Sequence, residues 1–434
     1  MATTKTHEAM LPQFDYFAPE YVQRSIEKTY YEKITPVKIP ARGGPLEFKL
    51  AKSSDYTSLH DTKLELTVKV TKAKGAAAAD HATDKVMVAN NVLHTIFEKL
   101  EVEIDGNKKE ECTMYPYRAY LDTITSHRHD ALDVRGSLQG WKKDTAGKFA
   151  VVEYVGTAGG IITRTEPFVS SNEITLMGQL HGDLMAQELC IPPDMEMLIR
   201  LTPSDSDFAL LAAADSKYEV HITGAKLWVA RVTANPSLTA VHEKLFKGMN
   251  PVFSMRQVAL KAFQLNAGIK ETTLTNIFEN NLPDRFLVGF LSNGSLTGAI
   301  DANPFFFQTF GVTFLQATVG STKIPNDPYE PKFATGEYIR EYLALLEEFN
   351  ADEGDTTIDI SKEEFKDGYT LFPFRVVPRS RGGDILGPAA CVAGGLSLKL
   401  RFASALTDVV NVLVYYESRG KVDLKSKPST SATK

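Results

Sequence analysis

Cysteine and tryptophan are scarce in this 434-residue chain, which contains three Cys and two Trp. Cys112, Cys190 and Cys391 lie far apart and form no C-x-x-C pair. This spacing argues against a disulfide framework and against a zinc knuckle. We therefore expect the chain to be made in the reducing interior of a cell, where structural disulfides are rare.

Long apolar runs are also lacking. Residues 1–13 contain no continuous apolar stretch of the kind that a signal peptide requires. The longest uncharged stretch, 302–322, carries Asn303, Gln308 and Gln316, which make it too polar for a bilayer span. We expect a soluble protein with no membrane span, not secreted through a cleaved signal peptide.

Neither sign of charge predominates, since 48 Lys and Arg face 54 Asp and Glu and the formal net charge is −6. This balance excludes a polycation built to coat nucleic acid. Hydrophobic residues make up 43% of the chain, which is typical of a globular protein rather than a disordered one. At about 150 residues per domain, the length predicts two or three domains.

Strand-like patterns predominate from Pro45 onward. Apolar and polar residues alternate with a period of two, or form short apolar runs, over 64–70, 100–104, 218–223, 227–230, 285–291, 396–402 and 409–416. Helical patterns are few, and the best candidates are 117–125 and 338–349. The Ala-rich insertion 72–84 is interpreted as a mobile loop. The sequence therefore predicts an all-β protein with a few short helices.

The two ends of the chain differ from the rest. Residues 1–40 hold four Pro and several aromatic residues, and we interpret them as an arm that packs on its own domain or along a neighbour. Residues 419–434 carry five basic residues against one Asp and are interpreted as a flexible basic tail. The candidate contacts of this tail with nucleic acid or an acidic partner are Arg419, Lys421, Lys425, Lys427 and Lys434.

The order of local signals in the first half recurs in the second. Each half contains an Asn, a strand-like run that ends at a Gly, and an R-x-Y-L string in a predicted helix: Asn91, Gly106 and 118–121, then Asn303, Gly320 and 340–343. A string with three fixed positions also arises by chance. A true duplication would divide the chain into two similar β units.

A plausible domain junction lies at 234–237. The first unit would then cover 41–235 and the second 236–418. Many short strands with few helices favour sandwiches or barrels. Two similar units of this size favour two consecutive eight-stranded jelly-roll β-sandwiches, each with its strands in Greek-key order.

The histidines carry no clear metal-binding signature. His127 and His129 have the spacing of two ligands on a strand, but they follow a predicted helix and flank Arg128, so a solvated loop is the better interpretation. His94 and His181 each lack a second ligand group nearby in the sequence. No metal-binding residue is predicted.

Glycine-rich strings carry no catalytic signature either. The Gly-Ser strings at 136–140 and 294–298 lack the central Ser of a nucleophile elbow. The string at 320–323 lacks the spacing of a phosphate-binding loop. The sequence therefore assigns no catalytic and no cofactor-binding residue, and we expect a protein that is not an enzyme and has no cofactor.

Several strings, taken in order, resemble a single family. They are NVLHTIF at 91–97, LEVEIDG at 100–106, YPYRAYL at 115–121, GQLHGDL at 178–184, LWVARV at 227–232 with NPS at 235–237, NPFFFQTF at 303–310, YIREY at 338–342 and GYTLF at 368–372. They resemble virus-derived proteins of invertebrate genomes and, with them, the double-jelly-roll major capsid proteins of Polinton/Maverick-type elements and related eukaryotic DNA viruses. The 72–84 insertion and the basic tail are not marks of that family.

The resemblance implies a major capsid protein of a virion. Three chains would form a homotrimeric, pseudo-hexagonal capsomer, and neighbouring capsomers would build an icosahedral shell with minor capsid or vertex proteins as further partners. Separately from the resemblance, the basic excess of the tail in an acidic chain predicts that it faces the shell interior and contacts nucleic acid or an acidic partner. Two alternatives stay open: a jelly-roll carbohydrate-binding module, with Trp141 and Trp228 as its sparse large aromatics, and a minor capsid or vertex protein, which usually needs one jelly roll.

Overall fold

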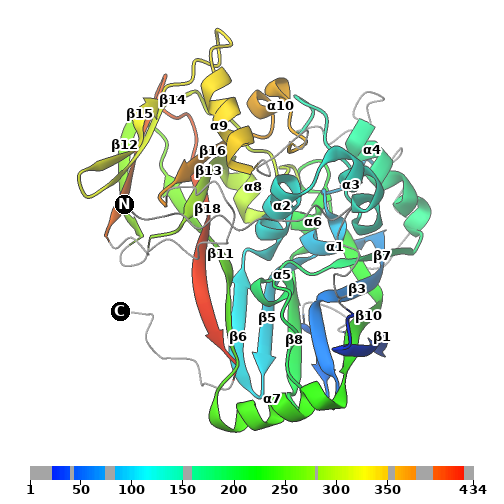
Figure 1. Ribbon diagram of the computed structural model, residues 1–434. Coiled ribbons are helices and arrows are strands. Elements are labelled where there is room, and N and C mark those ends of the chain that lie inside the picture. The colour runs from blue at the N-terminus through cyan, green and yellow to red at the C-terminus, as the bar shows by residue number, and fades with distance from the viewer. Residues whose placement is uncertain are drawn as a thin grey trace, which may run out of the picture.

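A computed structural model describes residues 22–39, 44–73, 84–149, 159–278, 282–349, 357–377 and 394–424. The strands of these residues form four four-stranded antiparallel sheets and one short two-stranded ladder. Figure 1 shows the sheets as two sandwiches side by side, with helix α7 (Pro236–Gly248) running beneath both at the lower end. Within the described ranges, no helix is both long and apolar enough to cross a lipid bilayer.

The first sandwich contains eight main strands. In chain order they are β1 (Ile26–Ile34), β2 (Leu46–Leu50), β3 (Tyr56–Lys72), β5 (Phe97–Ile104), β6 (Asn107–Thr113), β7 (Ile174–Gln179), β8 (Met197–Pro203) and β10 (Tyr218–Ala234). One sheet has the order β1-β10-β3-β7 and the other β2-β8-β5-β6. The first sheet thus joins the first, eighth, third and sixth strands, and the second joins the second, seventh, fourth and fifth, which is the jelly-roll order.

The second sandwich repeats this order strand for strand. Its strands are β11 (Val252–Leu265), β12 (Glu271–Phe278), β13 (Arg285–Ser292), β14 (Val312–Val319), β15 (Thr322–Tyr329), β16 (Leu371–Arg375), β17 (Leu396–Phe402) and β18 (Val410–Asp423). The sheets are β11-β18-β13-β16 and β12-β17-β14-β15. The double jelly roll predicted from the sequence is therefore confirmed.

Most helices lie in the connections between strands. They are α1 (Val92–Thr95), α2 (Tyr115–Ser126), α3 (His129–Val134), α4 (Gly159–Thr165), α5 (Asp183–Ala186), α6 (Ser206–Ala209), α8 (Asn293–Thr297), α9 (Ile339–Phe349) and α10 (Lys362–Lys366), with two 3-10 turns, η3 (Gly136–Gln139) and η4 (Glu166–Ser171), and a short ladder of β4 (Met87–Val88) with β9 (Leu210–Leu211). Figure 1 places α3, α4, α9 and α10 toward the end opposite α7.

The recurring sequence signals occupy equivalent places in the two halves. Both Asn residues lie between the third and fourth strands, and both R-x-Y-L strings lie in the helix between the fifth and sixth strands, α2 and α9. Gly106 and Gly320 each belong to a two-residue turn between the fourth and fifth strands. Their φ angles of 73° and 58° lie in the left-handed region, which glycine adopts without strain. The echo in the sequence therefore reflects a repeated architecture.

Alternating patterns place one face of each core strand inward. In β17 the side chains of Leu396, Leu398 and Leu400 are fully buried, while the intervening Ser397 and Lys399 lie on the outer face. Successive side chains of a strand point to opposite faces, so this alternation identifies the strand from sequence. The same rule holds for Leu64–Val70 within β3, as predicted.

The ends of the jelly rolls differ from the predicted domain limits. Strand β1 lies inside the predicted arm 1–40, because this edge strand is exposed on both faces and its sequence shows no apolar alternation. Strand β18 continues to Asp423, past the predicted start of the tail at 419, because its last residues pair with β11. Residues 1–21 of the arm, 74–83 of the Ala-rich insertion and 425–434 of the tail lie outside the described residues.

Two helices differ from the sequence interpretation. The segment at 234–237, interpreted as a junction, begins α7: the Asn235 side chain accepts a hydrogen bond from the Ser237 N–H, and Pro236 occupies the first turn. This Asn-Pro pair is a helix start signal. The predicted loop around His129 is the short helix α3, whose Leu132 is buried.

Candidate functional site: the junction of the two jelly rolls

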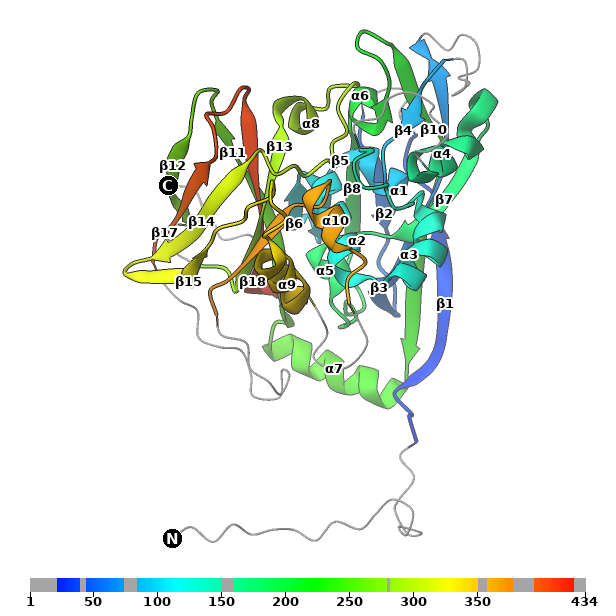
Figure 2. The same cartoon turned by 90° about the horizontal axis from the view of Figure 1, so that it is seen from above.

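Helix α2 connects the hydrophobic cores of the two halves. Every residue from Tyr115 to Thr125 is buried. Tyr115 and Ala119 belong to the core of the first jelly roll, whereas Tyr120 and Ile124 belong to the core of the second. Figures 1 and 2 place α2 between the two sandwiches. The halves are thus joined by continuous apolar packing through one helix of the first half.

Aromatic contacts tie α2 to the second half. The Tyr120 ring stacks on Phe305 with centroids 4.2 Å apart and planes 1° apart. The Tyr117 hydroxyl donates a hydrogen bond of 2.8 Å to the Ser295 carbonyl oxygen in α8. Such stacked pairs contribute about 0.5–1.5 kcal/mol beyond the burial of their surface.

The same helix carries a buried cation. The Arg118 guanidinium is 1% exposed and lies 2.6 Å from Asp183 Oδ1 in α5, 3.4 Å from Glu110 Oε1 in β6 and 3.6 Å from Asp122 Oδ2 one turn along α2. Arg118 also donates to the Val258 carbonyl oxygen of β11 at 3.4 Å. One guanidinium therefore holds three carboxylates of the first half and reaches a strand of the second.

The polar contacts continue into the second jelly roll. Asp122 accepts a hydrogen bond from the Tyr415 hydroxyl of β18 and lies 3.7 Å from the Arg256 guanidinium of β11. Arg256 in turn donates to Glu417 at 3.0 Å, and Glu417 also accepts from Arg285 at 2.8 Å. Arg285 and Arg375 both pair with Glu348 in α9. A chain of ion pairs thus runs from β6 through the junction to the helix of the second half that corresponds to α2.

The environment shifts the acid–base equilibria of this cluster. Burial raises the pKa of Glu110 and of Asp183, and the Arg118 guanidinium opposes that shift. Burial acts in the same direction on Asp122, but its contacts with His181 and Arg118 hold its pKa well below the usual range. A charged Asp122 is therefore the anionic centre that faces both arginines of the junction.

A pair of histidines lies beside the cluster. His94 in α1 is fully buried: its Nδ1 lies 2.9 Å from the Tyr115 hydroxyl and its Nε2 3.0 Å from Gln139 Oε1. The His181 ring meets it edge to face, with centroids 4.7 Å apart. Burial lowers the pKa of His94 well below its usual value, so the ring is neutral near pH 7. Sequence reasoning missed this pair because the two residues are distant in the chain.

A cavity opens next to these histidines. His60, His127, His181 and Arg135 of the first half line it together with Arg256 of the second. The His127 Nδ1 lies 3.3 Å from the Thr123 carbonyl oxygen, and His129 lies outside the cavity, 3.0 Å from Asp359. Among the described residues, no group of three or more His, Cys, Asp or Glu side chains is arranged to hold a metal ion.

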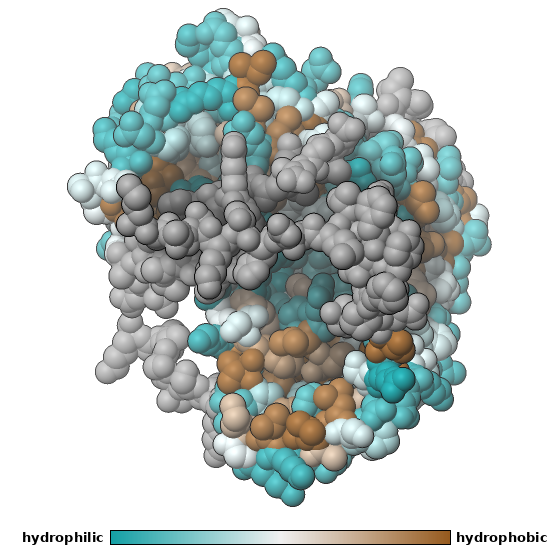
Figure 3. Space-filling view, viewed as in Figure 1, coloured by the Kyte–Doolittle hydropathy of each residue, from teal (hydrophilic) through white to brown (hydrophobic). Residues whose placement is uncertain are grey.

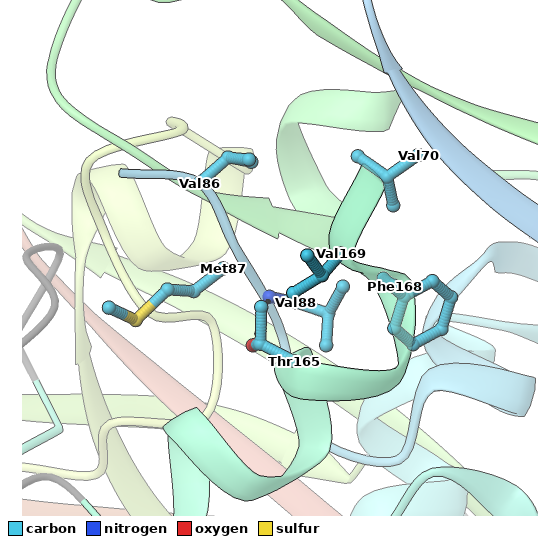
Figure 4. Close-up of a pocket in the computed structure, with 7 residues that line it drawn as sticks. All are labelled: Val70, Val86, Met87, Val88, Thr165, Phe168 and Val169. Carbon is cyan, nitrogen blue, oxygen red and sulfur yellow. Dashed lines mark hydrogen bonds between the residues drawn. The ribbon is translucent and has the colours of Figure 1, made fainter. Parts of the chain in front are cut away.

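A second, small cavity is apolar. Figure 4 shows its lining from β3, β4, α4 and η4, which consists of Val70, Val86, Met87, Val88, Thr165, Phe168 and Val169. The single hydroxyl, on Thr165, accepts a hydrogen bond of 3.2 Å from the Val88 N–H. The lining therefore offers no free polar group to orient a ligand, and the cavity is a packing space of the first core.

The candidate tail residues divide between the described and undescribed parts of the chain. Arg419 and Lys421 lie in β18, opposite Arg256 and Ser254 of β11, and Arg419 forms an ion pair of 2.9 Å with Asp284. Lys421 is exposed. Lys425, Lys427 and Lys434 lie outside the described residues.

The tryptophans do not form an exposed binding surface. Trp141 is 3% exposed and packs against Tyr120. The Trp228 indole N–H donates a 2.6 Å hydrogen bond to Glu65 on the neighbouring strand β3. Both rings are thus engaged in the first half.

Comparison with known sequences does not identify a family for this chain. No protein-family model matches the chain. An uncharacterized Caenorhabditis elegans protein, F54H12.2, is 22% identical over 357 residues, which cover 79% of this chain and 82% of that protein.

Comparison with solved structures identifies the fold. The Faustovirus major capsid protein superposes with a TM-score of 0.60 at 9% identity, covering 96% of this chain and 93% of its own. A chain of the Sputnik virophage gives 0.58 at 9% identity, covering 99% and 96%. The mavirus major capsid protein gives 0.50 at 12% identity, covering 100% and 99%. The chain therefore has the double-jelly-roll fold of viral major capsid proteins over its whole length.

The first prediction concerns Arg118. Replacement of Arg118 by Met should lower the free energy of unfolding by about 3–5 kcal/mol, because buried carboxylates lose their counter-ion. The matched control is Arg340→Met, which alters the same position of the R-x-Y-L string in the second half. Arg340 is exposed and pairs with the exposed Asp327, so its loss should cost less than about 1 kcal/mol. Denaturant titration of both variants measures the difference, and equal costs would contradict the role given to Arg118.

The second prediction concerns pH. The unfolded His94 binds a proton below about pH 6.5, whereas the buried ring of the native state does not, so stability should fall as pH decreases from there by up to about 1.4 kcal/mol per unit. His94→Gln should flatten this part of the stability curve. His129→Gln should not flatten it, because the carboxylate of Asp359 raises the pKa of exposed His129 and that contribution has the opposite sign. Thermal unfolding between pH 5 and 8 is the measurement.

Proposed function

We propose that this chain is a major capsid protein, the structural subunit of a viral or virus-like shell. The observation that carries the proposal is the pair of consecutive jelly rolls with one strand order, matched over nearly the full length by viral capsid proteins. The buried junction supports it, since α2 and Arg118 hold the halves as one unit. A subunit of a closed shell must keep one shape while it contacts neighbouring subunits on every side.

The finer part of the proposal is the assembly. Three copies of a chain with two similar sandwiches would arrange six similar sandwiches around the trimer axis. A homotrimer would therefore approximate a hexagon. Such trimers would pack laterally into an icosahedral shell, with minor capsid or vertex proteins closing the positions that hexagons cannot fill. Closed rotational symmetry is the usual arrangement of identical subunits. The place of the protein is then the virion.

The junction chemistry supports a structural rather than a catalytic role. Its buried ionisable groups are paired with one another: Arg118 with three carboxylates, and Glu417 with Arg256 and Arg285. The carbohydrate-binding alternative is weakened by the engaged rings of both tryptophans. The vertex-protein alternative is weakened by the duplicated sandwich, because a pentameric vertex usually uses one.

The third prediction tests the trimer. Size exclusion with light scattering should give a species of three times the 47.9 kDa chain mass. Each interface should bury more than about 1,000 Å² to persist at micromolar concentrations. Negative-stain images of concentrated samples should then show hexagonal tiles or closed shells. A monomer at all concentrations would contradict the proposal.

The orientation in the shell follows from the chain ends. Ser25, near the first described residue, accepts a hydrogen bond from the Asn235 N–H at the start of α7. Leu424, the last, donates one to the Pro251 carbonyl oxygen just after α7. The described residues thus begin and end beside α7. We infer that this end faces the shell interior, where the basic residues of the tail contact the genome or an acidic partner.

The fourth prediction tests this tail. A Lys425→Gln, Lys427→Gln, Lys434→Gln variant should assemble normally but retain less nucleic acid, because lysine–phosphate contacts supply salt-dependent affinity. The control removes the same charge elsewhere, at the exposed Lys49, Lys332 and Lys399. The nucleic acid content of purified particles is the readout. Equal content in native and tail-variant particles would exclude the tail contact.

A further inference from the structure

Helix α7 lacks the packing that normally stabilises a helix of its length. It spans 13 residues, and the described part of the chain buries none of them. Isolated helices shorter than about 12–15 residues are marginal in water, because most helix stability in proteins comes from a packed apolar face. The chain nevertheless places Leu238, Val241, Leu245 and Phe246 in α7.

Large apolar residues are exposed in α7 and just past its end. Val241 and Leu245 lie one turn apart in the helix, 53% and 49% exposed, and they are followed by Met249 at 67% and by Val252, at the start of β11, at 48%. We call these four residues the α7 stripe. Figure 3 shows apolar surface gathered at the lower end of the molecule, where Figure 1 places α7. Large apolar groups clustered in this way mark a binding surface.

The adjacent face of α7 packs toward the first jelly roll. His242 and Phe246 border a groove there, and the His242 Nδ1 lies 2.7 Å from the Tyr56 hydroxyl. This contact holds α7 against the body, while Val241 and Leu245 beside it stay exposed. The helix is therefore fixed in place with two large apolar side chains uncovered by the described residues.

The N-terminal segment is the part of the chain best placed to cover the stripe. It joins the described structure next to the start of α7, where the Ser25 carbonyl oxygen accepts from the Asn235 N–H at 2.9 Å. Its 21 residues reach up to about 70 Å when extended, and α7 is about 20 Å long. The segment contains Met10, Leu11, Phe14, Tyr16 and Phe17.

Charge adds to this fit. Residues 1–21 carry Glu8, Asp15 and Glu20 against a single Lys5, whereas α7 exposes Lys244 and Lys247 with a single acidic residue, Glu243. Acidic side chains beside an apolar core of the segment would face these lysines at the rim of the stripe. Exposed pairs of this kind add orientation rather than much stability.

We propose that residues 1–21 dock on the α7 stripe of their own chain, with the aromatic residues 14–17 covering Val241 and Leu245. Docking within one chain is favoured over docking on another copy. Residues 1–21 are covalently linked to the chain that carries α7, and a short linker gives them a local concentration in the millimolar range. The proposal does not rest on the capsid function and holds for the free chain in solution.

Limited proteolysis of the full-length chain tests the contact. Chymotrypsin cleaves after Phe14, Tyr16, Phe17 and Tyr21, and docked residues are cut only when the segment transiently opens. A Val241→Glu, Leu245→Glu variant should be cleaved at these sites at least about tenfold faster than the native chain, because the cleavage rate follows the population of the open form. The matched control is Leu138→Glu, at an exposed leucine of η3 distant from α7. Equal rates in the native chain and the stripe variant would overturn the proposal.

A second variant leaves α7 intact, so that faster cleavage in it cannot result from misfolding of the helix. Phe14→Ser, Phe17→Ser changes only the segment and should speed cleavage after Tyr16 and Tyr21 by a similar factor. An unchanged rate at these two sites would also overturn the docking.

Cross-linking identifies the copy that provides the segment. A Phe17→Cys, Leu245→Cys chain is mixed with its ¹⁵N-labelled form, oxidised and analysed as peptides. Disulfide-linked peptides with a single isotope composition support docking within one chain. Peptides of mixed composition would overturn the proposal in favour of exchange between copies, and no linked peptide would overturn it altogether.

Discussion

The buried guanidinium of Arg118 is the contact on which the unity of the molecule depends. A charge at 1% exposure is costly unless its partners are close and well oriented. Here the partners are three carboxylates from β6, α2 and α5, and the same guanidinium reaches the backbone of β11 in the other jelly roll. Any sliding of one sandwich over the other would break these contacts. The junction therefore specifies one relative placement of two folds that are each complete in their strand order.

The two halves share one order of strands and helices, but equivalent residues lie in different surroundings. The helix between the fifth and sixth strands carries R-x-Y-L in both, yet the Arg118 of α2 is buried and the Arg340 of α9 is exposed. The reason is position: α2 lies between the sandwiches, whereas α9 packs on the outside of β16. Glu348 of α9 still joins the ion-pair chain through Arg285, so the second helix supports the junction from its far side.

The α7 end combines features that the opposite end lacks in the described ranges. The described residues begin and end there, and α7 links the last strand of the first sandwich to the first strand of the second. Its apolar stripe lies beside the point where residues 1–21 join the body. The end of the molecule at which the described residues begin and end thus also carries exposed apolar residues of α7.

Local patterns of the sequence by themselves identified β3, β5, β10, β13, β17 and β18 and the helices α2 and α9, because alternation acts between near neighbours, but they did not identify the other main strands. Together with the recurring order of signals in the two halves, these patterns favoured two similar β units. They missed β1, whose two exposed faces leave no alternation, and α7, whose start signal at Asn235-Pro236 was interpreted as a junction. The junction site was decided only by tertiary structure. Glu110, Asp183 and Tyr415 meet the charges of α2 from strands and loops far along the chain, and whether an arginine is buried or solvated depends on what packs over it rather than on its own sequence neighbours.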